Sequence, residues 1–71
     1  MMRQAMWDQL AGGWKQFRGE IRKQWGKLTD DDLEYIAGKR EKLIGRIQER
    51  YGMAEADAAN QVDHWAANVK L

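Results

Sequence analysis

Apolar residues recur every three or four positions along most of the chain, which is the period of one face of an α-helix. The clearest stripe runs through Trp14, Phe17, Ile21, Trp25 and Leu28. Gly26 stands near the end of this stripe, where a glycine in the left-handed conformation commonly ends a helix. We find no segment that alternates apolar and polar residues as a half-buried strand does. The pattern therefore predicts an all-α protein.

The best-defined helix start lies at residues 29–33. Thr29 can cap the helix, and Asp32, three residues later, can reach back to the backbone amide of Thr29 in a variant of the capping box. Leu28 and Leu33 occupy the two positions of a hydrophobic staple. Three successive aspartates in the first turn also suit the positive end of the helix dipole. Thr29 and Asp32 are therefore predicted helix-cap residues.

Three helices are expected from this point, over about residues 30–37, 39–51 and 54–69. Gly38 is expected to form a turn or kink, and Gly52 is expected to end the second of these helices. With the helix from Trp14, they make a small four-helix domain over residues 14–71. Residues 1–13 continue the apolar spacing, but Gly12-Gly13 disfavours a helix. We expect a variable N-terminal segment there, either frayed or a separate short helix.

The helical stripes also predict which side chains fill the core. Four Trp are available for this purpose in a chain of 71 residues, and each buried indole removes a large apolar surface from water. Trp7 lies off the main stripe and is the best candidate for an exposed contact, whereas the other aromatics could alternatively form a stacking platform. The expected core residues are Trp14, Phe17, Ile21, Trp25, Leu28, Leu33, Ile36, Leu43, Ile47, Tyr51, Val62 and Trp65.

Two glycines fall inside predicted helices. Gly19 and Gly45 each lower helix propensity by nearly 1 kcal/mol. An interior glycine commonly has a packing cause, so we expect two helices to approach closely at these points. The alternative is backbone access to a phosphate, but neither glycine belongs to a phosphate-loop pattern.

The composition leaves few residues for catalysis. The chain has no Cys, no Ser and one Thr, so a hydroxyl or thiol nucleophile has almost no candidate. His64 is the only histidine and is expected at the surface. The three aspartates at 30–32 lack the alternating ligands and distal Glu of a Ca²⁺ loop. We therefore expect no catalytic residue, no metal and no cofactor, and without a signal sequence or a membrane span we expect a cytoplasmic protein.

Charge is arranged in blocks, although the net charge is only +1. Residues 15–29 and 39–50 are basic, and residues 30–38 between them carry four acids and no base. Lys42, Arg46 and Arg50 repeat at a spacing of four, where like charges destabilise a helix slightly. An anionic partner such as nucleic acid would explain this arrangement. The candidate anion contacts are Lys15, Arg18, Arg22, Lys39, Lys42, Arg46 and Arg50.

Other interpretations of the same features stay open. The basic residues can instead form a solvated face that is partly neutralised by the neighbouring acids. The helix that carries the Trp14–Leu28 stripe is basic with an aromatic face, so it could lie on an anionic membrane. The same stripe could also join two chains, giving a monomer or a weak homodimer.

Several short motifs resemble one known family. The runs WKQFRG at residues 14–19 and QWGKLTDDD at residues 24–32 are similar to the CsbD-like family of small bacterial stress-response proteins. Similarity continues at residues 38–40, 43–45 and 48–52, and Trp65 falls where the family has a late Trp. The resemblance implies two helical hairpins packed crosswise, as in SAM-like folds, and expression linked to general or osmotic stress. It carries over no catalytic residue.

The predicted function is therefore that of a non-enzymatic stress-response protein that acts by binding or by abundance. The residues do not identify its molecular partner. The alternative is a nucleic-acid-binding module that uses the basic residues on phosphates.

Overall fold

Five helices make up the part of the chain that the structure, a computed structural model, describes: residues 2–69, with side chains from residue 6 onward. They are α1 (Met2–Gly12), α2 (Trp14–Gln24), α3 (Asp30–Ile36), α4 (Arg40–Tyr51) and α5 (Glu55–Asn68). Residues 2–69 contain no strand. The all-α prediction is confirmed, and the N-terminal segment adds a fifth helix to the four expected.

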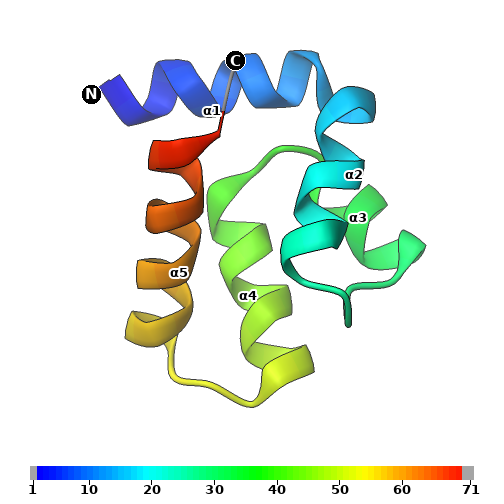
Figure 1. Cartoon of the computed structure of the whole chain (residues 1–71), viewed down its shortest axis with the longest axis vertical. Coiled ribbons are helices and arrows are strands. Elements are labelled where there is room, and N and C mark those ends of the chain that lie inside the picture. The colour runs from blue at the N-terminus through cyan, green and yellow to red at the C-terminus, as the bar shows by residue number, and fades with distance from the viewer. Residues whose placement is uncertain (1, 70–71) are drawn as a thin grey trace.

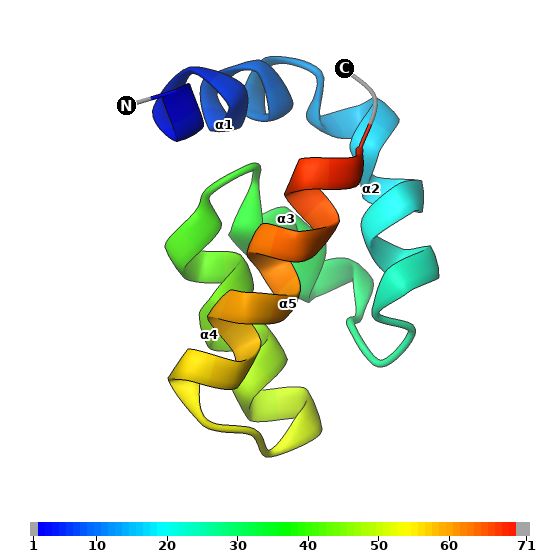
Figure 2. The same cartoon turned by 60° about the vertical axis from the view of Figure 1, so that its left-hand side comes forward.

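The helices are arranged around an antiparallel pair formed by α4 and α5 (Figure 1). Helix α1 lies across the upper ends of the bundle, next to the last turn of α5, and the turned view shows the same placement (Figure 2). Helices α2 and α3 cover the other side of α4. The crosswise packing of two hairpins stays a prediction.

The core receives apolar side chains from every helix. Buried apolar residues are Trp7, Leu10, Ile21, Trp25, Leu28, Leu33, Ile36, Leu43, Ile44, Ile47, Ala58 and Val62. The expected core residues Trp14, Phe17, Tyr51 and Trp65 are only partly buried and pack against this cluster. Two of the indoles keep their N–H group bonded: the Nε1 of Trp14 donates to the carbonyl of Leu33 at 2.9 Å. The indole of Trp25 likewise donates to Gln61, at 3.0 Å.

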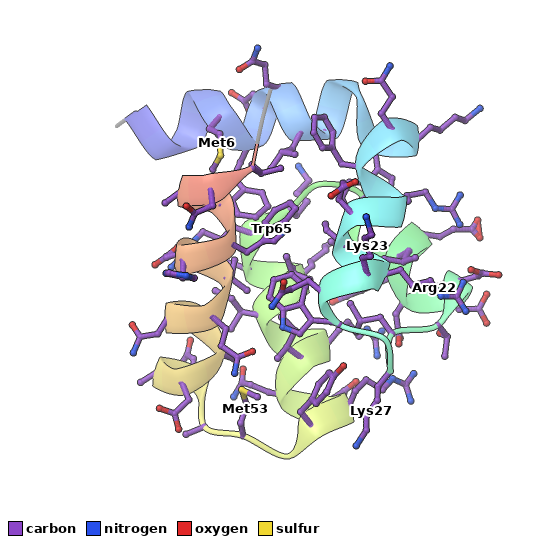
Figure 3. All side chains as sticks on the ribbon, viewed as in Figure 1. Met6, Arg22, Lys23, Lys27, Met53 and Trp65 are labelled. Carbon is purple, nitrogen blue, oxygen red and sulfur yellow. The ribbon has the colours of Figure 1, made fainter. Side chains whose placement is uncertain are left out.

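Trp7 corrects one prediction. It was expected to be an exposed contact, but only 4% of it is accessible to solvent. Trp7 and Leu10 lie three residues apart, so they share the face of α1 that points into the bundle. The Trp7 ring lies 6.4 Å from that of Trp65, which in turn lies 5.8 Å from Trp25. Figure 3 shows Trp65 below α1, inside the molecule.

The end of α2 corrects a second prediction. The helix stops at Gln24, and Gly26 is not in the left-handed conformation. The amide of Trp25 donates to the carbonyl of Ile21, which completes the last helical bond, and the backbone of Trp25 then leaves the helical conformation with φ −127° and ψ 83°. The chain leaves the helix at this residue, so no left-handed glycine is needed. Leu28 therefore lies in the connection to α3 and is still buried.

The glycines inside helices correct a third prediction. A Cβ atom at Gly19 or Gly45 would meet no other group within 4 Å, so no second helix approaches there. The close approach is at Gly38 instead, where a Cβ would lie 2.5 Å from the Cα of Ala11 in α1. Gly38 also has a positive φ of 82°, in the turn that was expected at this residue. The backbone of α1 thus rests directly on the turn between α3 and α4.

Alanine at these three glycines should separate the two situations. We expect Gly19→Ala and Gly45→Ala each to raise the free energy of unfolding by about 0.5–1 kcal/mol, because alanine favours a helix and has room. Gly38→Ala should lower it, since the new methyl group would collide with Ala11 in a strained backbone. Urea unfolding followed by Trp fluorescence measures all three. Destabilisation by Gly19→Ala or Gly45→Ala would show that the helix interior has a packing partner after all.

Candidate functional site

The charged blocks of the sequence meet at the beginning of α3. Thr29 caps this helix: its Oγ1 accepts from the amide of Asp32 at 3.1 Å, and its own amide donates to Oδ2 of Asp32 at 3.0 Å. This reciprocal pair is the capping box expected from the sequence. Asp32 is only 2% exposed, so its carboxylate needs partners that replace water.

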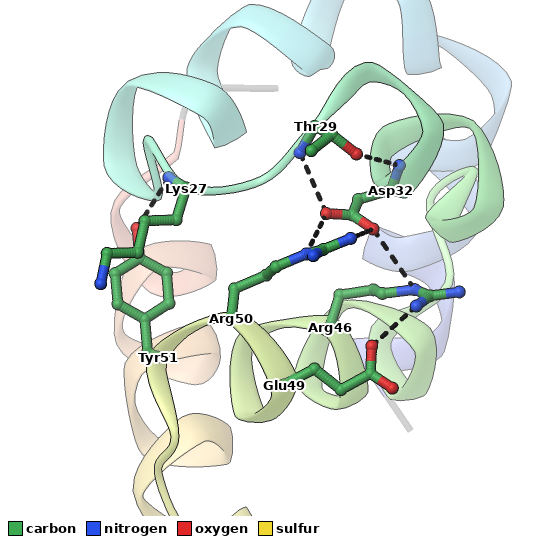
Figure 4. Close-up of polar contacts among 7 residues, drawn as sticks. All are labelled: Lys27, Thr29, Asp32, Arg46, Glu49, Arg50 and Tyr51. Carbon is green, nitrogen blue, oxygen red and sulfur yellow. Dashed lines mark hydrogen bonds and ion pairs between the residues drawn. The ribbon is translucent and has the colours of Figure 1, made fainter.

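Arginines of α4 supply those partners (Figure 4). Arg50 binds Asp32 with two parallel hydrogen bonds, from Nε to Oδ2 at 2.7 Å and from Nη2 to Oδ1 at 2.9 Å. The Nε of Arg46 lies 3.6 Å from Oδ1 of Asp32, and its Nη1 donates to Glu49 at 2.7 Å. Two arginines one helical turn apart therefore lie beside one buried carboxylate. The negative charge of Asp32 offsets the repulsion between the two guanidinium groups.

The acidity of Asp32 follows from this arrangement. The hydrogen bonds from Arg50 lower the pKa of Asp32 well below its usual range, although burial by itself would raise it. The backbone amide of Thr29 lowers this pKa further. In the same contact, hydrogen bonding to Asp32 raises the pKa of Arg50. The pair is therefore ionised throughout the neutral range.

The seven candidate anion contacts fall into two groups. Arg22 is hydrogen-bonded to Asp30, and Arg46 and Arg50 hold Asp32, so these three bind acids of their own chain. Within residues 2–69, the structure shows no ion pair or ring contact for Lys15, Arg18 or Lys39, and Lys42 lies against an aromatic ring. Acids at the start of α3 thus pair with arginines from both basic helices, α2 and α4. Contact of the other four with an anionic partner stays a prediction.

Tyr35 forms the most unusual part of the surface. It is 47% exposed, and within residues 6–69 it is the only exposed large hydrophobic residue. The Nζ of Lys42 lies 4.8 Å from its ring centroid, and the guanidinium carbon of Arg46 lies at 4.2 Å. Beside it is a shallow hollow of about 290 Å³, lined by Tyr35, Glu41, Lys42, Gly45, Arg46 and Glu49. The sequence indicated this site only indirectly: Tyr35 lies off the inward positions of its short helix.

Other polar contacts join the helices without forming a chemical centre. Arg40 binds Asp63 with two hydrogen bonds of 2.9 Å, which fasten α4 to α5 and raise the pKa of Arg40. His64 is exposed, as expected. In the described part of the chain, no three His, Cys, Asp or Glu side chains come together as a possible metal site. No helix among residues 2–69 is both long and apolar enough to cross a membrane.

Most of the Trp14–Leu28 stripe faces inward. Ile21, Trp25 and Leu28 are buried in the core, and Trp14 and Phe17 are partly buried against it. The three buried side chains are not available to an anionic membrane or to a second folded chain. Both interpretations stay predictions, which rest on the partly exposed Trp14 and Phe17.

Comparison with known proteins identifies the family. The model of the CsbD-like family matches residues 8–60, which include α2, α3 and α4. The matched segment also contains the whole Asp32 cluster, which consists of Thr29, Asp32, Arg46 and Arg50. The chain belongs to the CsbD-like family. The UPF0337 protein ECA0631 of Pectobacterium atrosepticum is 60% identical to this CsbD-like protein over 58 residues, covering 82% of this chain and 84% of that protein.

Relatives occur in other bacteria as well. The UPF0337 protein YjbJ of Escherichia coli K12 is 53% identical over 58 residues, with the same coverage of 82% and 84%. The UPF0337 protein RPA4217 of Rhodopseudomonas palustris is 48% identical over 64 residues, covering 90% of this CsbD-like protein and 97% of the relative. The likeness therefore extends over most of each protein.

Replacing Asp32 tests whether the cluster holds the CsbD-like domain together. We expect Asp32→Asn to lower the free energy of unfolding by about 1–3 kcal/mol, because Arg50 and the amide of Thr29 lose a charged acceptor. Asp31→Asn is the matched control, since Asp31 is exposed in the same helical turn. It should change stability by only a few tenths of a kcal/mol. Equal effects of the two substitutions would contradict a special role for Asp32.

The same pair of proteins gives a pH test. The pKa of Asp32 is lower in the folded state than its ordinary value of about 3.9. Its stabilising contribution is therefore fully present above about pH 5 and is lost as the pH falls through the folded pKa. We expect the stability gap between wild type and Asp32→Asn to be constant from about pH 5 to 8 and to narrow below pH 4. Urea unfolding at a series of pH values measures this gap, and a constant gap down to pH 2.5 would refute it.

Proposed function

We propose that this protein is a non-catalytic stress-response protein of the bacterial cytoplasm that acts stoichiometrically, by binding or by abundance. The observation that carries the proposal is the use of Asp32, the most buried charged group described, to cap α3 and hold Arg46 and Arg50. The only Thr of the chain, Thr29, takes part in the same structural contact. Residues that would be candidates for chemistry thus have a role in the fold.

Family membership supports the context of this proposal. The CsbD-like family is associated with stress responses. Its resemblance to this chain implies induction under general or osmotic stress, and the matched segment contains the Asp32 cluster. The outer surface of the folded domain, including Tyr35 and the unpaired cations of α2, is the part available to a partner.

The dependence of protection on copy number tests stoichiometric action. In a bacterium that lacks its own CsbD-like genes, we expect survival under osmotic stress to rise in proportion to the amount of this protein over a wide range. A catalyst would instead saturate at few copies per cell, because each molecule acts repeatedly. Graded expression with quantitative immunoblotting and colony counts measures this relation. A plateau at low copy number would overturn the proposal.

Replacing His64 provides a control for hidden catalysis. His64→Gln removes the only imidazole from an exposed position, so the fold should be unaffected. Protection at equal expression should equal that of the wild type. A loss of protection with unchanged stability would point to acid–base chemistry at His64 and contradict a non-catalytic role.

Nucleic-acid binding is the second candidate function, and one observation favours it. Tyr35 presents an exposed ring beside Lys42, and single-stranded nucleic acids bind to surfaces that combine stacking rings with cations. Three of the seven candidate contacts bind acids of this chain, so at most four remain for phosphates: Lys15, Arg18, Lys39 and Lys42.

Salt dependence measures how many of these cations contact phosphates. We expect a plot of log affinity against log salt for duplex DNA to have a slope no steeper than about −3.6, at roughly −0.9 for each of the four phosphates contacted. Lys39→Gln should make it shallower by about 0.9. Lys23→Gln is a matched control, because it removes one exposed charge outside the candidate set. Fluorescence anisotropy with labelled DNA and RNA gives these values, and no binding at 20 mM salt would eliminate this candidate.

A further inference from the structure

The connection between α1 and α2 consists of one residue. Gly13 donates its amide to the carbonyl of Gln9 at 3.1 Å, as a residue within a continuous helix would. Its carbonyl accepts from the amide of Gln16 at 2.9 Å, so bonding resumes at once. The break lies in the backbone of Gly13 itself, with φ −110° and ψ 31°. Helix α1 bends away from α2 at this point (Figure 2).

Helix α1 reaches its packing partners only through this bend. Trp7 and Leu10 enter the core, the Trp7 ring lies against Trp65 of α5, and Ala11 rests on Gly38. These partners belong to the later part of the chain. A straight helix through Gly13 would carry α1 away from all of them. The same surfaces would then be open to an α1 helix from elsewhere.

The attachment of α1 is weakened by one buried group. The Nε1 of Trp7 is buried and has no hydrogen-bond partner within the described residues. An unsatisfied buried donor reduces the stability of the contact that buries it. Release of α1 therefore restores a hydrogen bond from this indole to water while it exposes the apolar face.

We propose that α1 is exchanged between two copies of this chain, which gives a two-fold symmetric dimer. In the dimer, α1 of each copy packs on α5 and the Gly38 turn of the other, and residues 2–24 form one continuous helix of about 35 Å. Every contact of α1 is kept, because the two chains are identical. Only the backbone of Gly13 changes conformation. The low helix propensity of glycine disfavours the continuous helix at this position.

A second copy suits this surface better than an unrelated helix. A Cβ on Gly38 would lie only 2.5 Å from the Cα of Ala11, so the backbone of α1 approaches this turn as closely as it does because Gly38 has no side chain. Trp7 and Leu10, three positions apart on one face of α1, are both buried in the core, and the Trp7 ring lies 6.4 Å from that of Trp65. The α1 helix of another copy carries the same set of side chains at the same spacing.

Two neighbouring glycines provide a variant and its control. Gly13 is helical only in the exchanged form, so Gly13→Ala should favour the dimer about fivefold per chain, or about 25-fold in the dissociation constant. Gly12 is helical in both forms and has open space at its Cβ, so Gly12→Ala should leave the equilibrium unchanged. A Cβ at Gly13 lies 3.4 Å from the ring of Phe17, so the variant also fits the monomer.

The experiment is refolding from urea at several protein concentrations, followed by size-exclusion chromatography with light scattering. We expect a minor species at twice the 8.3 kDa of the chain for wild type and Gly12→Ala, and a major one for Gly13→Ala. An exchanged dimer must release α1 to dissociate, so it should persist after dilution and disappear only after unfolding and refolding at low concentration. Equal dimer fractions in both variants, only monomers at about 1 mM, or dimers that dissociate immediately on dilution would each overturn the proposal.

Discussion

The buried carboxylate of Asp32 is the constraint around which this domain is built. A charge with almost no solvent access is tolerated only when hydrogen bonds replace water. Asp32 obtains them from the first turn of its own helix and from Arg50 of α4. Both sources must be in place together, so the carboxylate fixes how far along α3 the helix α4 lies. A displacement of α4 that withdrew both Arg46 and Arg50 would leave the charge unpaired.

The aromatic residues act in a second, less directional way. Trp7, Trp65 and Trp25 come from α1, α5 and the end of α2, and their rings contact one another in sequence. A chain of 71 residues without cysteine has little apolar area with which to stabilise a fold. Large rings compensate for this shortage, and hydrogen bonds to Leu33 and Gln61 keep the indole N–H groups of Trp14 and Trp25 satisfied.

What the sequence could predict was set by the range of each interaction. The cap of Thr29 and Asp32 spans three residues, so its pattern is visible directly. The pairing of Asp32 with Arg50 spans 18 residues and depends on how α3 and α4 pack, so only the opposite charge blocks hinted at it. Trp7 was misplaced because Gly12-Gly13 hides the orientation of α1. A glycine shows that space or a turn is needed, but not which neighbour requires it, as Gly38 and Gly45 demonstrate.

The contact between Trp7 and Trp65 has a topological consequence. It joins a residue near the beginning of the chain to one near its end, while most other contacts of the bundle lie between helices that follow one another. Closing such a long loop costs more conformational entropy than forming the α4–α5 hairpin does. The contact of these two indoles therefore closes most of the polypeptide into one long loop. Loss of either ring would remove this contact between α1 and α5.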